Sequence, residues 1–258
     1  MDWNAARYHE ISTPQQLWGA RLLDRLAVNG AEHALDVGCG TGRLTALLAR
    51  RMSAGRVTAT DRSASMLATA ASWLREEAPG VRLVQADAAN LPFSRAFDVV
   101  FSAATFHWIR DHAALFRSII AALRPEGRLT AQCGGGPNLA LLLARADALM
   151  RERRFANAYT DWSEPWYFAD VESTIRRLAA AGFDRIDVTV EEAPASFAEP
   201  RAFEEFITTV CIRHHLEHLP RSERSVFARE LTRQAAADDP PFTLDYWRLN
   251  ISARRPPR

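Results

Sequence analysis

A glycine-rich turn near the start of the chain constrains the fold more than any other sequence feature. Its residues are Leu35-Asp36-Val37-Gly38-Cys39-Gly40-Thr41-Gly42, and they follow an apolar run and precede a helical pattern. Glycine allows a tight turn and lets a ligand approach the backbone closely. A strand, a glycine turn and a helix in this order predict a ligand-binding edge of a parallel sheet. The spacing is GxGxG, which differs from the GxGxxG of dinucleotide sites.

Short apolar runs alternate with helical patterns around this turn, which predicts a doubly wound α/β sheet. We expect two more strands late in the chain to pair as an antiparallel edge. We also expect a helical stretch over 202–237. The expected strands are 34–37, 57–60, 81–85, 97–102, 128–132, 186–190 and 247–253, and the early helices 17–26, 44–51, 66–77 and 112–123.

Two segments interrupt the strand–helix rhythm, at about 134–168 and 196–239. They hold aromatic and charged residues that a scaffold would not need. Substrate specificity commonly resides in such additions to a fold. We therefore expect residues 1–258 to form one domain in which these two segments are a helical cap, or lid, for the substrate.

The composition limits the classes of partner. The formal net charge is +1, which does not indicate a basic face for nucleic acid. No stretch approaches the roughly 20 apolar residues of a membrane helix. The three cysteines are widely spaced, as in a reduced, cytoplasmic chain. We expect a small-molecule substrate, no metal, no nucleic acid and no membrane, and the composition leaves the oligomeric state open.

Two further carboxylates extend the glycine motif. Asp61 ends the second expected strand, where it can accept from ribose hydroxyls, and Asp87 follows the third, where it can accept from an adenine amino group. With Asp36, they resemble the acidic positions of the class I methyltransferases that use S-adenosylmethionine. The resemblance implies strand order 3-2-1-4-5-7-6, a Rossmann-like fold, and a methionine moiety over Gly38 and Gly40. Other cofactor contacts are expected from Tyr8, Cys39, Gly42, Arg62, Met66, Ala88 and Ser102.

Three other readings of these residues stay open. The glycines and aspartates could be the turn and capping residues of any α/β protein. The chain could be an NAD-dependent oxidoreductase, with Asp61 on a ribose of that cofactor. It could also bind a cofactor without catalysing a reaction.

The substrate side resembles two groups of methyltransferases. The first is the trans-aconitate methyltransferases, matched by Asp2-Trp3-Asn4 with Tyr8, Phe106-His107-Trp108-Ile109, Pro165-Trp166-Tyr167-Phe168, Thr208 and Arg213. The second is the plant and insect enzymes that methylate small carboxylic acids, matched by Tyr8, Gln15 and Trp108. This resemblance implies that Tyr8 lies near the cofactor, while Gln15 and Trp108 donate hydrogen bonds to the substrate carboxylate. Alternatively, Trp108 is a core aromatic residue and Gln15 a surface helix residue.

A carboxylate acceptor needs no general base, because a group with a pKa near 4 is ionised at pH 7. His107 could instead be the base for a hydroxyl, nitrogen or carbon acceptor, or it could cap the following helix.

Other side chains also have two readings. Arg213 could bind a second substrate carboxylate or be a solvated helix residue. Trp166 and Tyr167 belong to an aromatic loop, 155–168, that could line a substrate pocket or pack within the cap. The string His214-His215-Leu216-Glu217-His218 matches a zinc peptidase pattern, but no distal ligand is evident.

Overall fold

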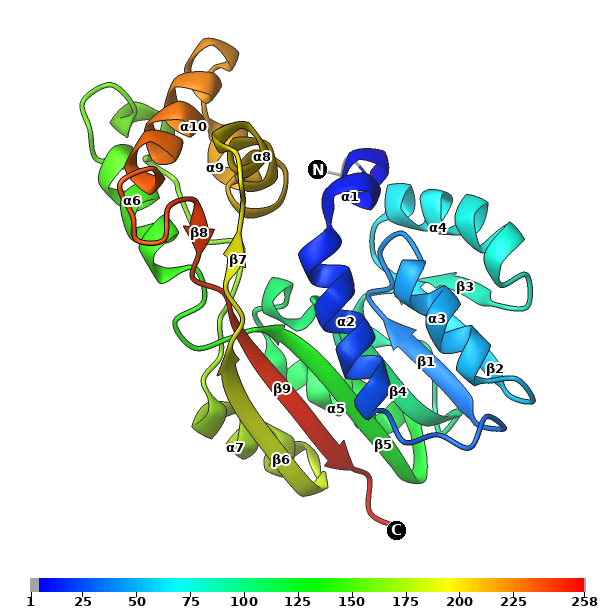
Figure 1. Ribbon diagram of the computed structural model, residues 1–258. Helices are drawn as coiled ribbons and strands as arrows, with labels where there is room; N and C mark the ends of the chain where they lie inside the picture. The colour runs from blue at the N-terminus through cyan, green and yellow to red at the C-terminus, as the bar shows by residue number, and fades with distance from the viewer. Residues whose placement is uncertain (1–4, 258) are drawn as a thin grey trace. The chain divides into compact units, whose positions relative to one another are not determined.

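The computed structural model describes residues 5–257, which divide into two compact units. The first unit contains 5–136, 166–191 and 248–257 and is built on a seven-stranded sheet of order β3-β2-β1-β4-β5-β9-β6 (Figure 1). This order confirms the predicted Rossmann-like sheet, because β9 takes the place of the seventh strand. The strands are β1 His33–Val37, β2 Arg56–Asp61, β3 Arg82–Gln85, β4 Phe97–Ala103, β5 Leu123–Gly134, β6 Asp184–Glu192 and β9 Trp247–Arg254.

The direction of the strands also follows the prediction. The neighbouring pairs from β3 to β5 are parallel, whereas β9 is antiparallel to β5, with Gly134 opposite Arg248. The carboxyl ends of the parallel strands therefore lie at one edge of the sheet. The amino end of β9 lies at the same edge, because its direction is reversed.

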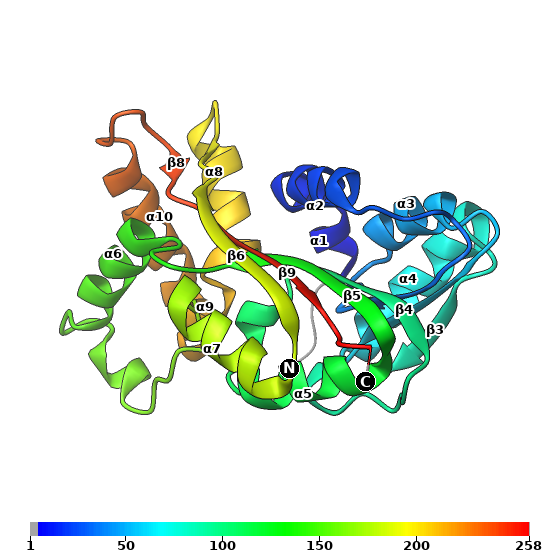
Figure 2. The same ribbon diagram turned by 90° about the horizontal axis from the view of Figure 1, so that it is seen from below.

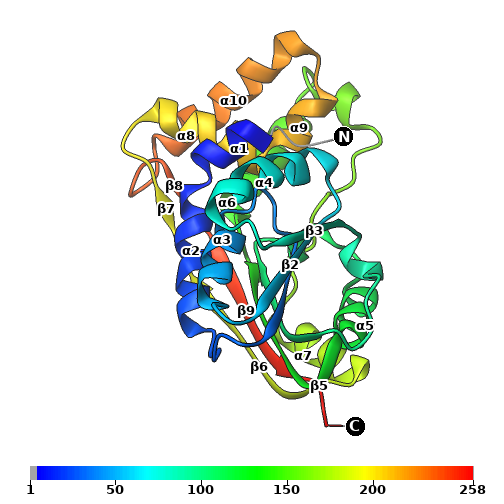
Figure 3. The same ribbon diagram turned by 90° about the vertical axis from the view of Figure 1, so that its right-hand side faces the viewer.

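Helices cover both faces of the sheet (Figures 2 and 3). One face is covered by α2 Thr13–Arg25, α3 Arg43–Arg51 and α4 Ala64–Glu77, and the other by α5 His112–Ala122 and α7 Val171–Ala181. Side-chain oxygens of Ser63, Asp111 and Asp170 cap the amino ends of α4, α5 and α7. The first unit also contains α1 Ala5–Ile11 and the short helices η1 Ala88–Asn90 and η2 Phe106–Trp108.

The apolar core lies on both sides of the sheet. Val99 and Phe101 of β4 pack with apolar residues of α2 and α3 on one face of the sheet. Val100 between them points to the other face and packs in the cluster that contains the apolar residues of α5. Successive strand residues point to opposite faces, so a strand covered on both faces is apolar throughout. The continuous apolar runs in the sequence thus have a direct physical cause.

The second unit contains 137–165 and 192–247. As predicted for 202–237, this part of the unit is mostly helical, but a π-helical turn separates α8 from α9, and Pro220 stands directly before α10. Proline lacks the backbone N–H that a helix interior needs, which explains the break before α10. The elements are α6 Ala140–Met150, η3 Ala156–Tyr159, β7 Ala195–Ser196, α8 Pro200–Phe206, η4 Ile207–Cys211, α9 Arg213–His218, α10 Arg221–Ala235 and β8 Thr243–Leu244.

Two further observations concern the described residues as a whole. None of their helices is both long and apolar enough to cross a membrane. Cys39, Cys133 and Cys211 are all free thiols.

Candidate cofactor and substrate site

The glycine turn connects β1 to α3 and holds its glycines for different reasons. Gly38 has a φ of +73°, and a Cβ there would lie 2.2 Å from the side chain of Thr105. Gly40 has a φ of +55°, but a Cβ there would meet no atom within 4 Å. Gly38 is therefore required by packing, whereas Gly40 presents its backbone to open space. Such a turn leaves room for a ligand to approach the chain.

Asp61 lies beside this turn at the end of β2. Its Oδ2 accepts a hydrogen bond from the backbone N–H of Gly40, and its Oδ1 accepts one from Ser63, each at 2.9 Å. Each carboxylate oxygen can accept a second hydrogen bond. Burial raises the pKa of Asp61 above its ordinary value, against the lowering effect of these N–H donors. Its acceptor capacity fits a pair of ligand hydroxyls.

Asp36 lies in β1 and is only 2% exposed. Its Oδ2 accepts a hydrogen bond from the Thr45 hydroxyl of α3 at 2.7 Å, which joins β1 to α3 across the turn. Burial, with the nearby charge of Asp61, raises the pKa of Asp36 to about 7. Ser102 of β4 supports the same end of β1, since its hydroxyl donates to the Val37 carbonyl at 2.7 Å.

The third predicted acidic residue is placed at the same edge of the sheet. Asp87 follows β3 and accepts a hydrogen bond from the Ala89 N–H at 2.9 Å, so it caps η1. The Ala86 N–H donates to the Asp61 carbonyl at 3.1 Å, which places the chain just before Asp87 beside the end of β2. The capping hydrogen bond uses one acceptor position of Asp87. The carboxylate is exposed and retains other acceptor positions for a ligand.

The other predicted cofactor residues surround these groups. Arg62, Met66 and Ala88 lie directly after β2, in α4 and in η1, and Cys39 and Gly42 belong to the turn itself. Burial, with the charges of Asp36 and Asp61, raises the pKa of the Cys39 thiol. The thiol is therefore protonated at neutral pH, as expected for a small residue of the turn.

His107 and Trp108 lie in η2, immediately after β4, in a loop fixed by three hydrogen bonds. The Tyr167 N–H donates to the His107 carbonyl at 2.7 Å, and His112 Nε2 lies 3.0 Å from the Phe106 carbonyl. The Gly134 N–H donates to His107 Nδ1 at 3.3 Å. The suggestion that His107 caps the next helix is wrong, because Asp111 accepts from the Ala114 N–H there.

The protonation state of His107 follows from its surroundings. Burial, the cation Arg248 and the nearby His112 lower the pKa of His107 to about 3. The ring is therefore neutral near pH 7. Since Nδ1 accepts from Gly134, the proton of the neutral ring resides on Nε2, which is a hydrogen-bond donor.

Aromatic rings surround His107 and Trp108 within the first unit. The ring centroids of Trp108 and Trp166 are 6.1 Å apart, and those of His107 and Phe168 are 5.8 Å apart. Tyr167 packs edge to face on His112 and its hydroxyl accepts from Arg177 at 2.9 Å. The structure thus gathers Trp166 and Tyr167 around the loop that carries His107 and Trp108.

The aromatic loop is divided between the two units. Phe155 and Tyr159 are buried in the second unit, where both pack against Phe227 of α10. Their role is packing within that unit, whereas Trp166 and Tyr167 lie in the first unit. Aromatic residues are spread evenly along 155–168, so the sequence alone does not show this division.

Gln15 lies in the first half of α2, half-buried. Its Oε1 atom is buried and has no hydrogen-bond partner within the described residues. Tyr8 lies in α1, but its side chain is outside the described part of the structure, as are Asp2, Trp3 and Asn4. Gln15 is thus half-buried with a buried amide oxygen, and its predicted substrate role stays a prediction.

Arg248 is a residue that the sequence analysis did not predict. Its guanidinium carbon lies 4.7 Å from the centroid of the Trp18 ring, and the residue is 3% exposed. Arg248 stands between apolar residues in the alternating strand Trp247 to Ala253. The only sequence signal for this residue is a positive charge at the start of the strand. Its burial against Trp18 of α2 is a tertiary contact, which a local pattern cannot predict.

The second unit holds Arg213 and the histidine-rich string. Arg213 donates to Glu217 at 2.8 Å, and its side chain is 16% exposed, so the reading as a solvated residue is wrong. His214 contacts Glu217, and the His218 ring packs against Trp162. Among residues 5–257 we find no group of three or more His, Cys, Asp or Glu side chains that could hold a metal.

Comparisons with known proteins agree with this geometry. A family model described as a methyltransferase domain matches residues 34–127. The trans-aconitate 2-methyltransferase of Escherichia coli (strain K12 / DH10B) is 30% identical over 260 residues, which cover 98% of each chain. The fold is similar to that of a Bacillus halodurans protein described as a methyltransferase, with TM-score 0.64, 17% identity and coverage of 92% and 98%. It is also similar to Haemonchus contortus phosphoethanolamine N-methyltransferase 2 in complex with S-adenosyl-L-methionine, with TM-score 0.59, 22% identity and coverage of 93% and 52%.

The chain belongs to the class I methyltransferases that use S-adenosylmethionine as cofactor. The reading as an NAD-dependent oxidoreductase is therefore wrong. The residues at the turn fit this cofactor, because Gly40 faces open space and Asp61 retains acceptor positions for two hydroxyls.

Proposed function

We propose that this methyltransferase transfers a methyl group to a carboxylate oxygen of a small organic acid. The protonation state of His107 carries this proposal: its pKa of about 3 makes it a poor base at neutral pH. A general base works best when its pKa lies near the working pH. A carboxylate is ionised at that pH and needs no base.

Neutral donors suit this acceptor. In the proposed site, the Gln15 amide, the Trp108 indole N–H and the His107 Nε2–H hold the carboxylate by hydrogen bonds. Neutral donors orient a carboxylate without the strong charge pairing of an arginine fork, so its oxygen remains a nucleophile. Positioning of this kind can supply about 7–11 kcal/mol of the barrier reduction. Bound S-adenosylmethionine supplies the electrophilic methyl group.

The comparisons support the same class of acceptor. The relatives that are 30% identical over nearly the whole chain are named for trans-aconitate, which is a carboxylic acid. A hydroxyl, nitrogen or carbon acceptor with His107 as base is the second candidate. The lowered pKa of His107 counts against it.

A screen with methyl-labelled cofactor tests the proposal directly. Small carboxylic acids, phenols and amines are offered in parallel, and we expect label only in base-labile methyl esters. With the acid acceptor and saturating cofactor, kcat/KM should stay level from about pH 6 to 8, since His107 does not titrate there. Label in phenols or amines alone would overturn the proposal, as would a rate increase near pH 6.5 that disappears in His107→Ala.

Trp108→Phe removes one hydrogen-bond donor and retains an aromatic ring. We expect kcat/KM for the acid to fall roughly tenfold to a hundredfold, the effect of one charge-assisted hydrogen bond. Trp73→Phe is the matched control, because Trp73 lies on α4 and is 37% exposed. Equal rates in the Trp108 variant and the wild type would remove Trp108 from the site.

We also propose that the second unit carries the substrate lid. It is built from 137–165 and 192–247, which include most of the segments that interrupt the strand–helix rhythm. If this is correct, acceptor and S-adenosylhomocysteine together should protect this unit from limited proteolysis more than S-adenosylhomocysteine alone. Equal cleavage under both conditions would contradict the lid assignment.

A further inference from the structure

A threonine joins the glycine turn to the loop that follows β4. Thr105 Oγ1 donates to the Gly38 carbonyl at 3.1 Å, and the Ala103 carbonyl lies 3.2 Å from the same oxygen. The Thr105 side chain also packs on Gly38, where an added Cβ would lie 2.2 Å from its Cγ2 and its Oγ1. One side chain therefore brings the turn and the loop into direct contact, although 67 residues separate them in the sequence.

The position of Thr105 in the loop makes this contact unusual. Thr105 is the N-cap residue of η2, where a threonine side chain ordinarily accepts from a backbone N–H of the helix. In the described part of the chain its hydroxyl makes no such capping bond and lies instead beside the two carbonyls. The backbone carbonyl of Thr105 accepts from the Trp108 N–H at 2.9 Å. Thr105 thus contacts the turn through its side chain and Trp108 through its backbone.

The backbone just before Thr105 has an uncommon conformation. Ala104 has a φ of +58°, in the left-handed region that residues with a Cβ seldom adopt. Its N–H donates to the Gln132 carbonyl of β5 at 2.7 Å, which helps to hold it there. Such conformations persist only where neighbouring contacts maintain them, and they are common in ligand clamps and switch regions. The loop therefore depends on its contacts on both sides, of which Thr105 supplies the one to the turn.

The Thr105 hydroxyl has one proton and two carbonyls within reach. A hydrogen bond to Gly38 joins the loop to the turn, whereas a hydrogen bond to Ala103 stays within the end of β4. A ligand shifts an equilibrium of this kind only if it interacts differently with the two states. A ligand bound at the turn does so, because it limits the positions that the Gly38 carbonyl can take.

We propose that the Thr105 hydroxyl couples the two ligands of the enzyme. Cofactor binding fixes the glycine turn, and Thr105 in turn orders the loop that carries His107 and Trp108 before the acceptor binds. Thr105 is a positioning residue in this inference, because it acts through the turn and the loop and not on a reacting atom. The inference rests on the proposed function only in treating this loop as part of the acceptor site.

Hydrogen exchange followed by mass spectrometry tests the coupling without an acceptor. The amides of Trp108 and Ile109 report on the loop, because they donate to the Thr105 and Phe106 carbonyls at 2.9 Å. We expect saturating S-adenosylhomocysteine to slow their exchange about tenfold in the wild type, the effect of one hydrogen bond. Thr105→Val retains the shape of the side chain and lacks the hydroxyl, so this slowing should be lost while the turn at 38–42 stays protected. Thr105→Ser retains the hydroxyl and should restore the slowing.

Thr174→Val is the matched control. Thr174 is fully buried in α7 of the same unit, and its hydroxyl donates to the Asp170 carbonyl at 2.7 Å. This variant removes the same group from the same unit, but we expect the loop to respond to S-adenosylhomocysteine as in the wild type. The thermal midpoint shows how much stability each variant loses, and saturation of each variant is checked by the protection of 38–42.

The outcomes separate this inference from the proposed function. The inference is wrong if the wild-type loop does not respond to S-adenosylhomocysteine, if Thr105→Val retains the slowing, or if Thr105→Ser behaves like Thr105→Val. It is also wrong if Thr105→Val loses protection of the turn together with that of the loop, because Thr105 would then only support the turn. If the loop responds through Thr105 but the labelled screen yields no methyl ester, the proposed function fails and the coupling stands. If methyl esters form and the loop does not respond, the coupling fails and the proposed function stands.

Discussion

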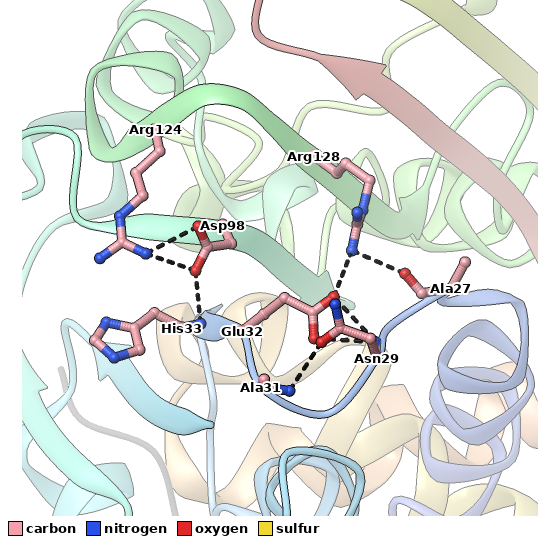
Figure 4. A network of polar contacts seen from close by, with 8 residues as sticks. All are labelled: Ala27, Asn29, Ala31, Glu32, His33, Asp98, Arg124 and Arg128. Atoms are coloured by element: carbon pink, nitrogen blue, oxygen red, sulfur yellow. Dashed lines mark hydrogen bonds and ion pairs between the residues drawn. The ribbon is translucent and has the colours of Figure 1, made fainter. Parts of the chain in front are cut away.

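The two ends of the parallel sheet carry buried and half-buried carboxylates in opposite electrostatic settings. At the amino ends of β1 and β4, Asp98 accepts from Arg124 at 2.7 and 2.9 Å and from the His33 N–H at 2.8 Å (Figure 4). Burial would raise its pKa, but these donors outweigh burial and lower it. At the carboxyl ends, Asp61 accepts only backbone N–H groups in the described residues, and burial raises its pKa.

The same contrast holds for a second pair of acids. Glu32 precedes β1, and its pKa is lowered because hydrogen bonds from Asn29 and Arg128 outweigh burial. Asp36 lies within β1, and its pKa is raised to about 7. Asp98 and Glu32 form ion pairs with arginines, whereas within residues 5–257 no ion pair is formed by Asp36 or Asp61, although the charge of Arg62 acts on Asp61. Perturbed carboxylates of the second kind are typical of functional sites.

The largest expected effect is on cofactor binding at Asp61. Asp61→Ala removes the acceptors that we assign to the ribose hydroxyls, so the affinity for S-adenosylhomocysteine should fall by about 1.5–3 kcal/mol. Titration calorimetry at pH 7.5 measures this loss. Asp98→Ala, at the other end of the sheet, should leave the affinity unchanged. If both variants bind equally well, the two ends of the sheet do not differ in function.

A smaller effect of opposite sign is expected for stability at Asp36. Its folded pKa of about 7 exceeds the ordinary 3.8, so the folded state holds a proton that the unfolded chain releases. The free energy of unfolding therefore falls as pH rises from about 4 to 7. Asp36→Asn removes this loss and can still accept from Thr45. We expect it to stabilise the protein on the order of 2 kcal/mol at pH 8, less than the full shift would give.

Urea unfolding at several pH values measures the effect of Asp36→Asn. The gain over the wild type should be largest above pH 7 and vanish below about pH 3, where the wild-type carboxyl is protonated in both states. A loss of stability at pH 8 would show that the charged form of Asp36 is favoured in the fold. Asp36 would then resemble the arginine-paired acids at the other end.

These contrasts also show which features a sequence can predict. The strands, their order and the position of Asp61 depend on local periodicity and on a turn whose glycines have fixed spacing. The state of His107 depends on Gly134 and Arg248, which are distant in the sequence. Arg248 is buried against Trp18 of α2, a tertiary contact that the local pattern of its strand does not show. Local patterns predict the acidic residues of the site but not their ionisation.

The smallest expected effect concerns the ion pair between Asp98 and Arg124. Their side chains are 33% and 41% exposed, and pairs this exposed contribute little. The lowered folded pKa of Asp98 means that its stabilising effect is present above about pH 4 and is lost below that value, as the pH falls through the lower folded pKa. We expect Asp98→Asn to cost about 1 kcal/mol at pH 7, including the weaker bond to the His33 N–H.

A double-mutant cycle with Arg124→Met separates the two contributions to this cost. The coupling energy between Asp98 and Arg124 should stay below about 1 kcal/mol and fall in 1 M salt, because exposed charges are screened. The remainder reflects the weaker hydrogen bond from the half-buried His33 N–H, which salt affects less. If Asp98→Asn instead stabilised the protein at pH 7, as expected for Asp36→Asn, arginine pairing would not explain why the two ends differ. The raised pKa values beside the glycine turn would then reflect burial alone.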